Sequence, residues 1–365
     1  MKINYINLVE QSKLERKQLI KIFDEVLSSG VYVGGNFVND FEKKINSYLQ
    51  TKNCVSLNSG TDALVLSLHA SGVKKGDEVI TTPNSFIAST AVIAHLGAKP
   101  VFVDVKDDQN IDPNKIEEKI TKKTKAIMPV HLTGRVCEMD KIIKIAKKYG
   151  LKVIEDAAQA IGSKFNGKFA GKFGDFGCFS AHPLKNLNAI GDSGYLVTQS
   201  RKNAIYINDL KNHGMTNRNR VKNFGYVSRM DNLQAGILKY RLSNLDNVIK
   251  KRRFNFDVYK NNLNRNIVFF PDEKKEEFNT YHTFVLQVPK REKLKKFLLK
   301  KGVQTAIHYP IPIHLQPAAR KFGYKLGDFP VTEKQSKRII TLPINQYLKK
   351  NDIIHISNLV NNFYK

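Results

Sequence analysis

Residues 178–197 read CFSAHPLKNLNAIGDSGYLV, an apolar strand followed by a polar loop and a glycine-flanked turn. Lys185 lies in that loop, five positions after Ser180. A lysine amine beside a buried strand, with a serine upstream that can bind phosphate, can form an imine with an aldehyde. A single lysine near a glycine-rich turn is also common without any such role, so this interpretation needs support from other segments.

Residues 54–68, CVSLNSGTDALVLSL, predict a short strand, a tight turn at Asn58-Ser59-Gly60 and a helix from Thr61. The free N–H groups and the positive dipole end at the start of a helix attract anions, and Gly60 lets the backbone approach a phosphate. Serine and asparagine are also the preferred helix-capping residues, so an ordinary capped helix explains this segment equally well.

Residues 151–160, LKVIEDAAQA, predict a strand that ends at Asp156. Open α/β sheets bind ligands at the carboxyl ends of their strands. If the ligand is a pyridine ring, Asp156 would keep the ring nitrogen protonated and Gln159 would reach the ring hydroxyl. The alternative is that Asp156 only caps a following helix. Phe86, after the predicted strand 78–82, is placed to cover the ring face, although phenylalanine more often packs in a core.

Three further segments follow the same order along the chain: PVHL at 129–132, GYVSRMDNLQ at 225–234 and HYPIPIH at 308–314. Together with the segments above, they resemble the DegT/DnrJ/EryC1/StrS family from about Leu27 to the C-terminus. The members are pyridoxal-phosphate (PLP) enzymes that mostly transaminate keto groups on nucleotide-linked sugars. The resemblance implies an α/β fold of the aspartate-aminotransferase type (fold type I), with a mostly parallel sheet sandwiched by helices and a smaller α+β C-terminal domain.

The resemblance also implies a role for each matching residue. Lys185 would form the covalent link to the cofactor and act as the acid and base, Asp156 would pair with the pyridinium nitrogen, and Gln159 would bond the ring oxygen. The other implied contacts are the phosphate with Ser59, Gly60, Thr61 and Ser180, the ring face with Phe86, and the sugar nucleotide with His308 and His314. No metal is implied.

One position departs from the family pattern G-x-N-x-R-x-D, because the segment from Gly225 to Asp231 has Val227 where many members have asparagine. In relatives that asparagine reaches the cofactor phosphate across the interface of a homodimer with shared active sites. A valine side chain cannot donate a hydrogen bond. Either another group replaces it or the phosphate has fewer contacts.

Lys185 also favours one reaction within the family. Relatives with histidine at this position perform deoxygenation, since histidine moves protons but cannot form the imine. We therefore expect amination of a keto-sugar nucleotide, 3- or 4-keto and deoxy, with glutamate or glutamine as donor, in amino-sugar synthesis for lipopolysaccharide or other surface glycans. The nucleotide, the keto position and the donor depend on pocket shape. Burial and the cationic ring would lower the pKa of Lys185 enough for a neutral base near pH 7.

The net charge of +27 suggests an alternative, a noncatalytic sensor or DNA-associated regulator on the same fold. The basic residues are spread along the chain, however, and many alternate with apolar residues at helical spacing, as in residues 139–148. We interpret them as solvated helix faces, which makes nucleic-acid binding an unfavoured reading. The joint presence of Lys185, Asp156, Gln159 and Ser180 favours catalysis, because a regulator needs no proton-transfer groups.

The chain of 365 residues is long enough for two domains, which we place at 1–240 and 241–365. It has no apolar stretch near the ~18 residues that span a bilayer, and its start does not resemble a signal peptide, so we expect a cytoplasmic protein without membrane contact. The three cysteines have no paired spacing, which indicates neither a zinc site nor disulfides.

Hydrophobic periodicity predicts alternating strands and helices, which is typical of a largely parallel sheet covered on both faces. The predicted strands are 78–82, 99–105, 125–130, 152–155, 175–180, 194–198, 281–288 and 303–309. The predicted helices are 12–29, 37–49, one from 61, 87–96, 140–149, one long run over 231–262 that contains the domain boundary, 290–300 and 351–363.

Overall fold

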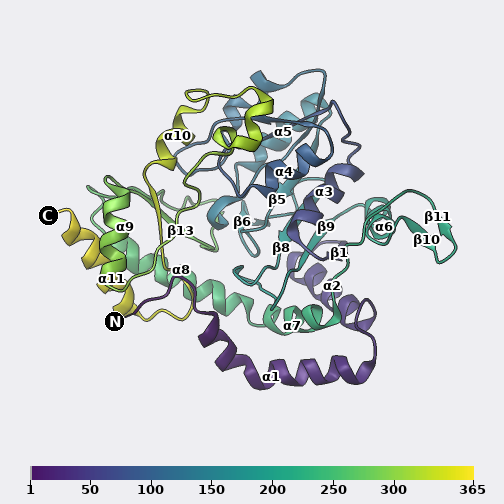
Figure 1. The fold of residues 1–365 in the computed structure, drawn as a ribbon, viewed down its shortest axis with the longest axis horizontal. Helices are drawn as coiled ribbons and strands as arrows, with labels where there is room; N and C mark the ends of the chain where they lie inside the picture. The colour runs from purple at the N-terminus through teal and green to yellow at the C-terminus, as the bar shows by residue number, and fades with distance from the viewer. Residues whose placement is uncertain (1) are drawn as a thin grey trace.

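A seven-stranded sheet forms the centre of the protein in the computed structural model, which describes residues 2–365 (Figure 1). The strand order is β1-β9-β8-β5-β4-β2-β3, and β9 alone runs antiparallel to its neighbours. The predicted, largely parallel sheet is therefore confirmed. The bounds are β1 Asn53–Leu57, β2 Glu78–Thr81, β3 Lys99–Phe102, β4 Thr124–Ile127, β5 Lys152–Asp156, β8 Phe176–Ser180 and β9 Gly194–Thr198.

Helices cover both faces of this sheet (Figure 1). Alternate residues of each strand point to opposite faces, so Val153 and Ile154 of β5 enter different hydrophobic clusters. The helices on the Val153 side are α2 (Asn36–Leu49), α5 (Met139–Tyr149) and α7 (Asn232–Leu242), with α1 (Leu8–Ser29) packed outside α7; those on the Ile154 side are α3 (Gly60–Ala70), α4 (Ala88–His95) and α6 (Arg201–Leu210).

A separate hydrophobic cluster organises the C-terminal part. It contains the antiparallel pair β13 (Phe284–Gln287) and β14 (Ile339–Leu342), and the helices α9 (Arg291–Lys300) and α11 (Lys350–Phe363). Helix α8 (Leu245–Asn262) joins the two parts, because its Ile249 packs in the cluster under the large sheet and its Phe256 in the C-terminal one. Ile3 also packs in the C-terminal cluster, so the first residues belong with the small domain, a change to the proposed division at 240.

Two predicted elements differ from the structure. The helical run over 231–262 is broken at Ser243 and Asn244 into α7 and α8. The predicted strand 303–309 makes only isolated bridges, Val303 with Ile3 and Ala306 with Thr341, because its backbone pairs with two different partners in turn. Elements that sequence periodicity did not reveal are mostly short: β6 Lys164–Phe165, β7 Lys168–Phe169, β10 Met215–Asn217, β11 Arg220–Val221, β12 Glu277–Phe278 and α10 Pro330–Ser336.

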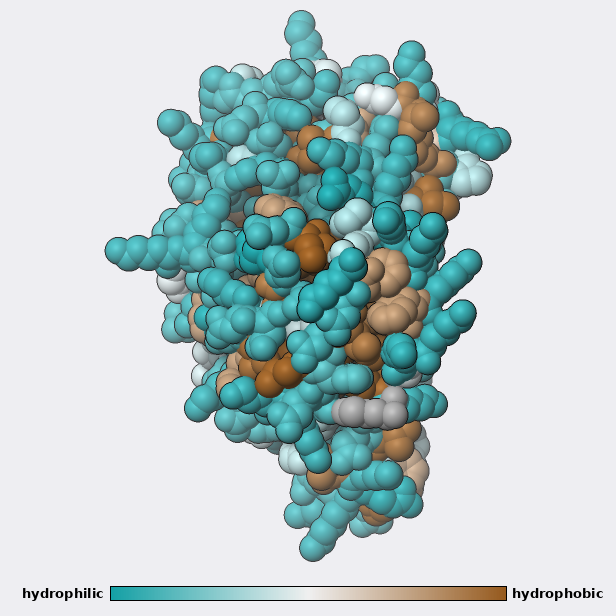
Figure 2. All heavy atoms as spheres, turned by 90° about the vertical axis from the view of Figure 1, so that its left-hand side faces the viewer, coloured by the Kyte–Doolittle hydropathy of each residue, from teal (hydrophilic) through white to brown (hydrophobic). Residues whose placement is uncertain are grey.

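The lysine-rich helices present their charges to solvent. In α5, Lys141, Lys144 and Lys147 are exposed while Ile142 and Ile145 are buried. Figure 2 shows that the face on the side of the C-terminal helices is mostly hydrophilic, with small separated apolar areas. No helix among residues 2–365 is long and apolar enough to cross a membrane.

The end of β5 is held by Glu155, whose side chain is fully buried. Its carboxylate bonds His131 Nε2 at 2.9 Å and accepts the backbone N–H groups of Gly171, Phe173 and Gly174 at 2.7, 2.6 and 2.7 Å. This network ties the strand that carries Asp156 to the loop after β4 and to residues 171–174.

Glu155→Ala leaves one buried and two partly buried N–H groups without an acceptor, so we expect the free energy of unfolding to fall by about 3 kcal/mol. Denaturant titration monitored by circular dichroism measures this loss. Glu117→Ala is the control, because Glu117 pairs with Lys148 on the surface and its removal should cost about 0.5 kcal/mol or less. Equal losses in the two variants would show that the Glu155 network has no special weight.

Candidate active site

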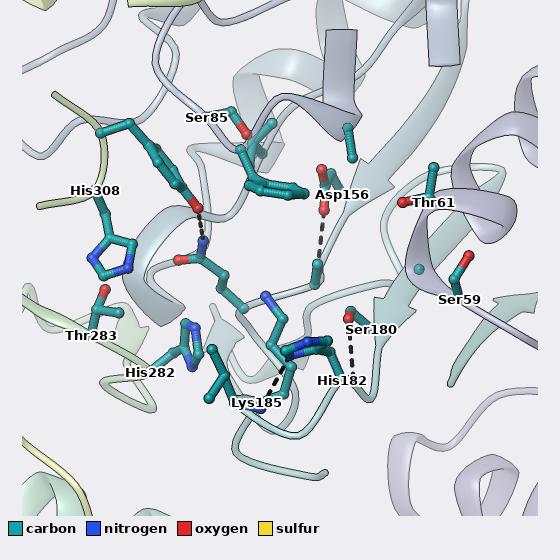
Figure 3. A pocket seen from close by; sticks show the side chains of 18 of the residues that line it. Ser59, Thr61, Ser85, Asp156, Ser180, His182, Lys185, His282, Thr283 and His308 are labelled. Atoms are coloured by element: carbon teal, nitrogen blue, oxygen red, sulfur yellow. Dashed lines mark hydrogen bonds between the residues drawn. The ribbon is translucent and has the colours of Figure 1, made fainter. Parts of the chain in front are cut away.

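The carboxyl ends of the parallel strands meet at a cavity of about 420 Å³. In Figure 3, Ser59, Thr61 and Ser180 lie on one side of this cavity, His282, Thr283 and His308 on the other, and the side chains of Lys185 and Asp156 in the middle. All the predicted site residues except His314 line it: Ser59, Gly60, Thr61, Phe86, Asp156, Gln159, Ser180, Lys185 and His308.

Ser59, Gly60 and Thr61 form the first turn of α3 at one side of the cavity. The Ser59 side chain caps the helix, as the capping alternative predicted. Gly60 packs so closely on Ser180 that a Cβ on it would lie 2.8 Å from the Ser180 Cβ, and a Cβ on Gly194 would lie 2.2 Å from the Ser59 carbonyl carbon. The glycines therefore let the α3 turn pack directly against β8 and β9, which places Ser180 beside the first turn of the helix, whose free N–H groups can bind an anion.

Asp156 is the last residue of β5, and its side chain is buried in the cavity wall. Its carboxylate accepts hydrogen bonds from Ser89 Oγ at 2.7 Å and from the Ala158 N–H at 3.2 Å. Residues 157–162 form turns, so Asp156 does not cap a helix. Since each carboxylate oxygen has a second lone pair, Asp156 can still accept a hydrogen bond from a protonated ring nitrogen.

Lys185 lies in the loop after β8, where its backbone N–H donates to the His182 carbonyl at 2.9 Å. Burial lowers the pKa of the Lys185 amine to about 8, and the negative charge of Asp156 opposes part of this shift. About one amine in ten is therefore neutral at pH 7, far more than for a lysine in water, and this fraction is available for nucleophilic and proton-transfer chemistry.

Gln159 and Phe86 approach the cavity from two different loops. Gln159 Oε1 accepts the Thr133 N–H at 2.8 Å, and its Nε2 donates to the Tyr309 hydroxyl at 3.5 Å, a long bond that a ligand oxygen can replace. Phe86 is 56% exposed, so it is not a core residue. Its ring lies 6.1 Å from the Tyr309 ring, tilted by 45°, at the cavity wall.

The two histidines of the HYPIPIH segment lie in different places. His308 lines the cavity and bonds Thr341 Oγ1 through Nδ1 at 2.9 Å. Burial, with the nearby charge of Lys185, lowers the pKa of His308 to about 4, so its imidazole is neutral at pH 7. His314 is buried outside the cavity, bonded to Glu333 at 3.1 Å in a short 3₁₀ turn. We therefore no longer assign His314 to the substrate pocket.

Sequence reasoning missed several lining residues, among them Tyr5, Arg252, His282, Thr283 and Asn345. They come from the N-terminal segment, from α8 and from loops of the C-terminal part, which meet the sheet edge only in the folded chain. The sequence contains one signal for them, the polar run Tyr281-His282-Thr283 directly before the apolar strand β13.

These residues fit PLP on three independent points. The first turn of α3 and Ser180 together face the cavity as an anion site, Asp156 has a free acceptor for a ring nitrogen, and Lys185 offers an amine of lowered pKa. When bound, PLP supplies an aldehyde for the covalent link and a protonated ring that accepts electrons.

Residues 13–361 match the DegT/DnrJ/EryC1/StrS aminotransferase family. The chain belongs to this family. The dTDP-3-amino-3,6-dideoxy-alpha-D-galactopyranose transaminase of Aneurinibacillus thermoaerophilus is 39% identical over 362 residues, which cover 99% of each chain. A pleiotropic regulatory protein of Geobacillus stearothermophilus is 38% identical over 369 residues, covering 100% of this chain and 99% of its own. The crystal structure of S. venezuelae DesV with a ketimine intermediate has a TM-score of 0.97 at 32% identity and covers 100% and 99% of the two chains.

This DegT-family protein is thus a PLP-dependent aminotransferase of fold type I, as the resemblance implied. Its own residues divide the work in the cavity. Lys185 would supply the amine that reacts with the cofactor aldehyde, and would carry a proton from the donor Cα. Asp156 would accept a hydrogen bond from the ring nitrogen, and the α3 turn would hold the phosphate. His308 remains neutral, so it does not compete with Lys185 for protons near pH 7.

Because only the neutral Lys185 amine attacks the aldehyde, the rate of PLP capture by the apoprotein should rise about tenfold per pH unit below about 8 and level off above it. Stopped-flow absorbance of the visible imine band measures this rate. Lys144→Ala, on the exposed face of α5, should keep the wild-type profile, whereas Lys185→Ala should give no band. A rate that is flat with pH below about 8 would contradict the assignment.

Proposed function

We propose that this protein transfers the amino group of glutamate or glutamine to a keto-sugar nucleotide whose sugar is a deoxy sugar with the ketone at C3 or C4. The observation that carries the proposal is the meeting of Lys185, Asp156 and the α3 turn in one cavity, with the opposite side of the cavity left for a second substrate (Figure 3). The transaminase of A. thermoaerophilus is named for a dTDP-linked 3-amino sugar, which favours C3 and a dTDP sugar as the first choice.

A regulatory role is the second candidate, because the relative from G. stearothermophilus is named a pleiotropic regulatory protein. A sensor that only bound a ligand would not need a lysine amine with a pKa of about 8 beside a buried carboxylate. The arrangement of Lys185 and Asp156 therefore supports catalysis over regulation.

A panel of dTDP- and UDP-linked 3-keto and 4-keto sugars tests the proposal directly. The purified enzyme with PLP and glutamate should convert at least one of them to an amino sugar, detected by mass spectrometry. Lys185→His is the matched variant, since histidine moves protons without forming the imine, and it should make no amino sugar. Amination of no keto sugar, together with salt-sensitive DNA binding by a colourless protein, would favour the regulatory role.

We further propose that the protein is a homodimer in which each subunit completes the other's site. Large apolar side chains on α1 are exposed, including Leu14 at 69% and Phe23 at 49%, and Phe224 is 98% exposed. Val227 is 53% exposed and does not line the cavity of its own subunit. A partner that covers these surfaces would bring its Val227 segment to this cavity, as the family resemblance implies.

Val227→Asn should tighten PLP binding about tenfold, because the asparagine amide can donate a hydrogen bond to the phosphate of the partner's site. PLP titration of the apoprotein measures the change, with sedimentation to verify the dimer. Tyr226→Asn, at the neighbouring exposed position, is the control and should leave the affinity unchanged. An unchanged affinity in Val227→Asn, or a monomer in sedimentation, would overturn this proposal.

A further inference from the structure

The outer side of α9 and the residues beside it form a strongly basic surface, which we call the α9 face. Residues 290–301 hold seven basic residues and one acid, Glu292, and the end of α10 adds Lys334, Lys337 and Arg338. These ten cations and one anion give the face a charge of +9, a third of the net charge of +27. None of these residues lines the active-site cavity, so transamination leaves this charge unexplained.

Hydrogen bonds hold the two segments of the α9 face together. The Val288 N–H donates to the Arg338 carbonyl at 2.9 Å, and Arg291 Nη1 donates to the Ser336 carbonyl at 2.5 Å. The start of α9 therefore lies against the end of α10. Figure 2 looks onto this side of the molecule, and most of the surface that it shows is hydrophilic.

The exposed side of α9 combines a row of lysines with one apolar side chain. Lys293, Lys296 and Lys300 are exposed and spaced by three and four positions, so they follow one line along the helix. Leu299 is 62% exposed and lies beside this line, three positions after Lys296. The row and the leucine together present cations and an apolar group to the same surroundings.

The lysines of the α9 face have no acidic partners. Among residues 2–365, no carboxylate lies within ion-pair distance of any of its eight lysines, and its single exposed acid, Glu292, pairs with Arg291 at 2.8 Å. On α5, by contrast, Lys141 pairs with Glu138 at 2.7 Å. An ordinary solvated face mixes charges of both signs. Crowded like charges repel one another, and an anionic partner would relieve that repulsion.

The chemistry of the α9 face fits an anionic bilayer better than a nucleic acid. The boundary between headgroups and acyl chains can bury an apolar side chain such as Leu299, whereas contact with nucleic-acid phosphates gives it nothing. Single-stranded nucleic acid binds on free aromatic rings. Here Phe297 packs against Phe363 with ring centroids 5.3 Å apart, and Lys301 Nζ lies 5.9 Å from the Phe297 ring.

We propose that the α9 face binds the surface of a bilayer that contains anionic phospholipids, with its lysines at the headgroup phosphates and Leu299 at the acyl boundary. The expectation of no membrane contact rested on the lack of a spanning segment, and a surface contact needs none. In Figure 1, α9 lies at the opposite end of the molecule from β10 and β11, so a partner subunit that covers this hairpin leaves the α9 face uncovered.

Co-sedimentation of the PLP-loaded enzyme with vesicles tests the proposal. Vesicles of phosphatidylcholine with about 30% phosphatidylglycerol should bind the enzyme at about 0.05 M salt and release it at about 0.5 M, because salt screens the charges. Phosphatidylcholine alone should bind little. The triple change Lys293→Gln, Lys296→Gln and Lys300→Gln should weaken binding about 100-fold, about fivefold for each lysine. Leu299→Ala should weaken it about tenfold.

The matched control is the triple change Lys141→Gln, Lys144→Gln and Lys147→Gln, which removes the same charge from the exposed side of α5. It should change vesicle binding by less than about twofold, because screening limits each charge to its surroundings. Both triple variants should capture PLP at the wild-type rate, which verifies their fold. If the α9 triple variant does not fold, Lys296→Gln and Leu299→Ala decide, with losses of about fivefold and tenfold.

Two results would overturn the proposal directly: no binding of the wild-type enzyme to the anionic vesicles, or equal losses in the two triple variants. A third would assign the α9 face to nucleic acid instead. In that case duplex DNA would bind more tightly than the vesicles, the α9 triple variant would lose this binding, and Leu299→Ala would keep it. Vesicle binding does not depend on which keto sugar the enzyme aminates, so the two proposals fail separately.

Discussion

The amine of Lys185 is enclosed in a cavity with only one buried carboxylate, Asp156, among its lining residues, and the chemistry of the protein depends on that enclosure. In water a lysine amine is almost fully protonated at neutral pH, and neither attacks an aldehyde nor accepts a proton. Burial disfavours the charged form and lowers the pKa of Lys185 to about 8. Asp156 limits this shift, since its negative charge favours the ammonium form. The balance leaves an amine that can exist in both protonation states during one turnover.

The cavity retains this balance because its walls are held by buried hydrogen bonds that the reaction does not use. Glu155 binds three backbone N–H groups and His131, which anchors the end of β5 next to Asp156. Ser89 orients the Asp156 carboxylate from α4. The α3 turn packs closely against Ser180, which is possible because Gly60 has no side chain. A site built on strand ends and helix starts in this way needs little reorganisation when substrate binds.

The substrate side has a different origin. It is formed where the C-terminal part and the first residues of the chain come against the sheet edge, with α8 packed in both hydrophobic clusters. Arg252 lies on α8 between Ile249 of one cluster and Phe256 of the other. The Arg252 cation is thus fixed at the junction of the two parts.

The sequence alone determined the fold class and the cofactor side of the site. Its strands are short and mostly apolar, and each predicted cofactor contact lies at a strand end, in the loop that follows a strand, or at a helix start, so local pattern places it. Parallel strands bring such ends to one edge whatever the details of packing.

Only the tertiary structure decided the substrate side. Tyr5, Arg252 and Thr283 are far apart in the sequence and follow no spacing rule, and their convergence depends on how the small domain packs. His314 is close to His308 in the sequence, only six positions away, but its side chain does not enter the cavity and instead bonds Glu333 in a separate buried contact. In short segments without a periodic pattern of burial, the local sequence does not determine which way each side chain points. The packing of the whole chain determines it.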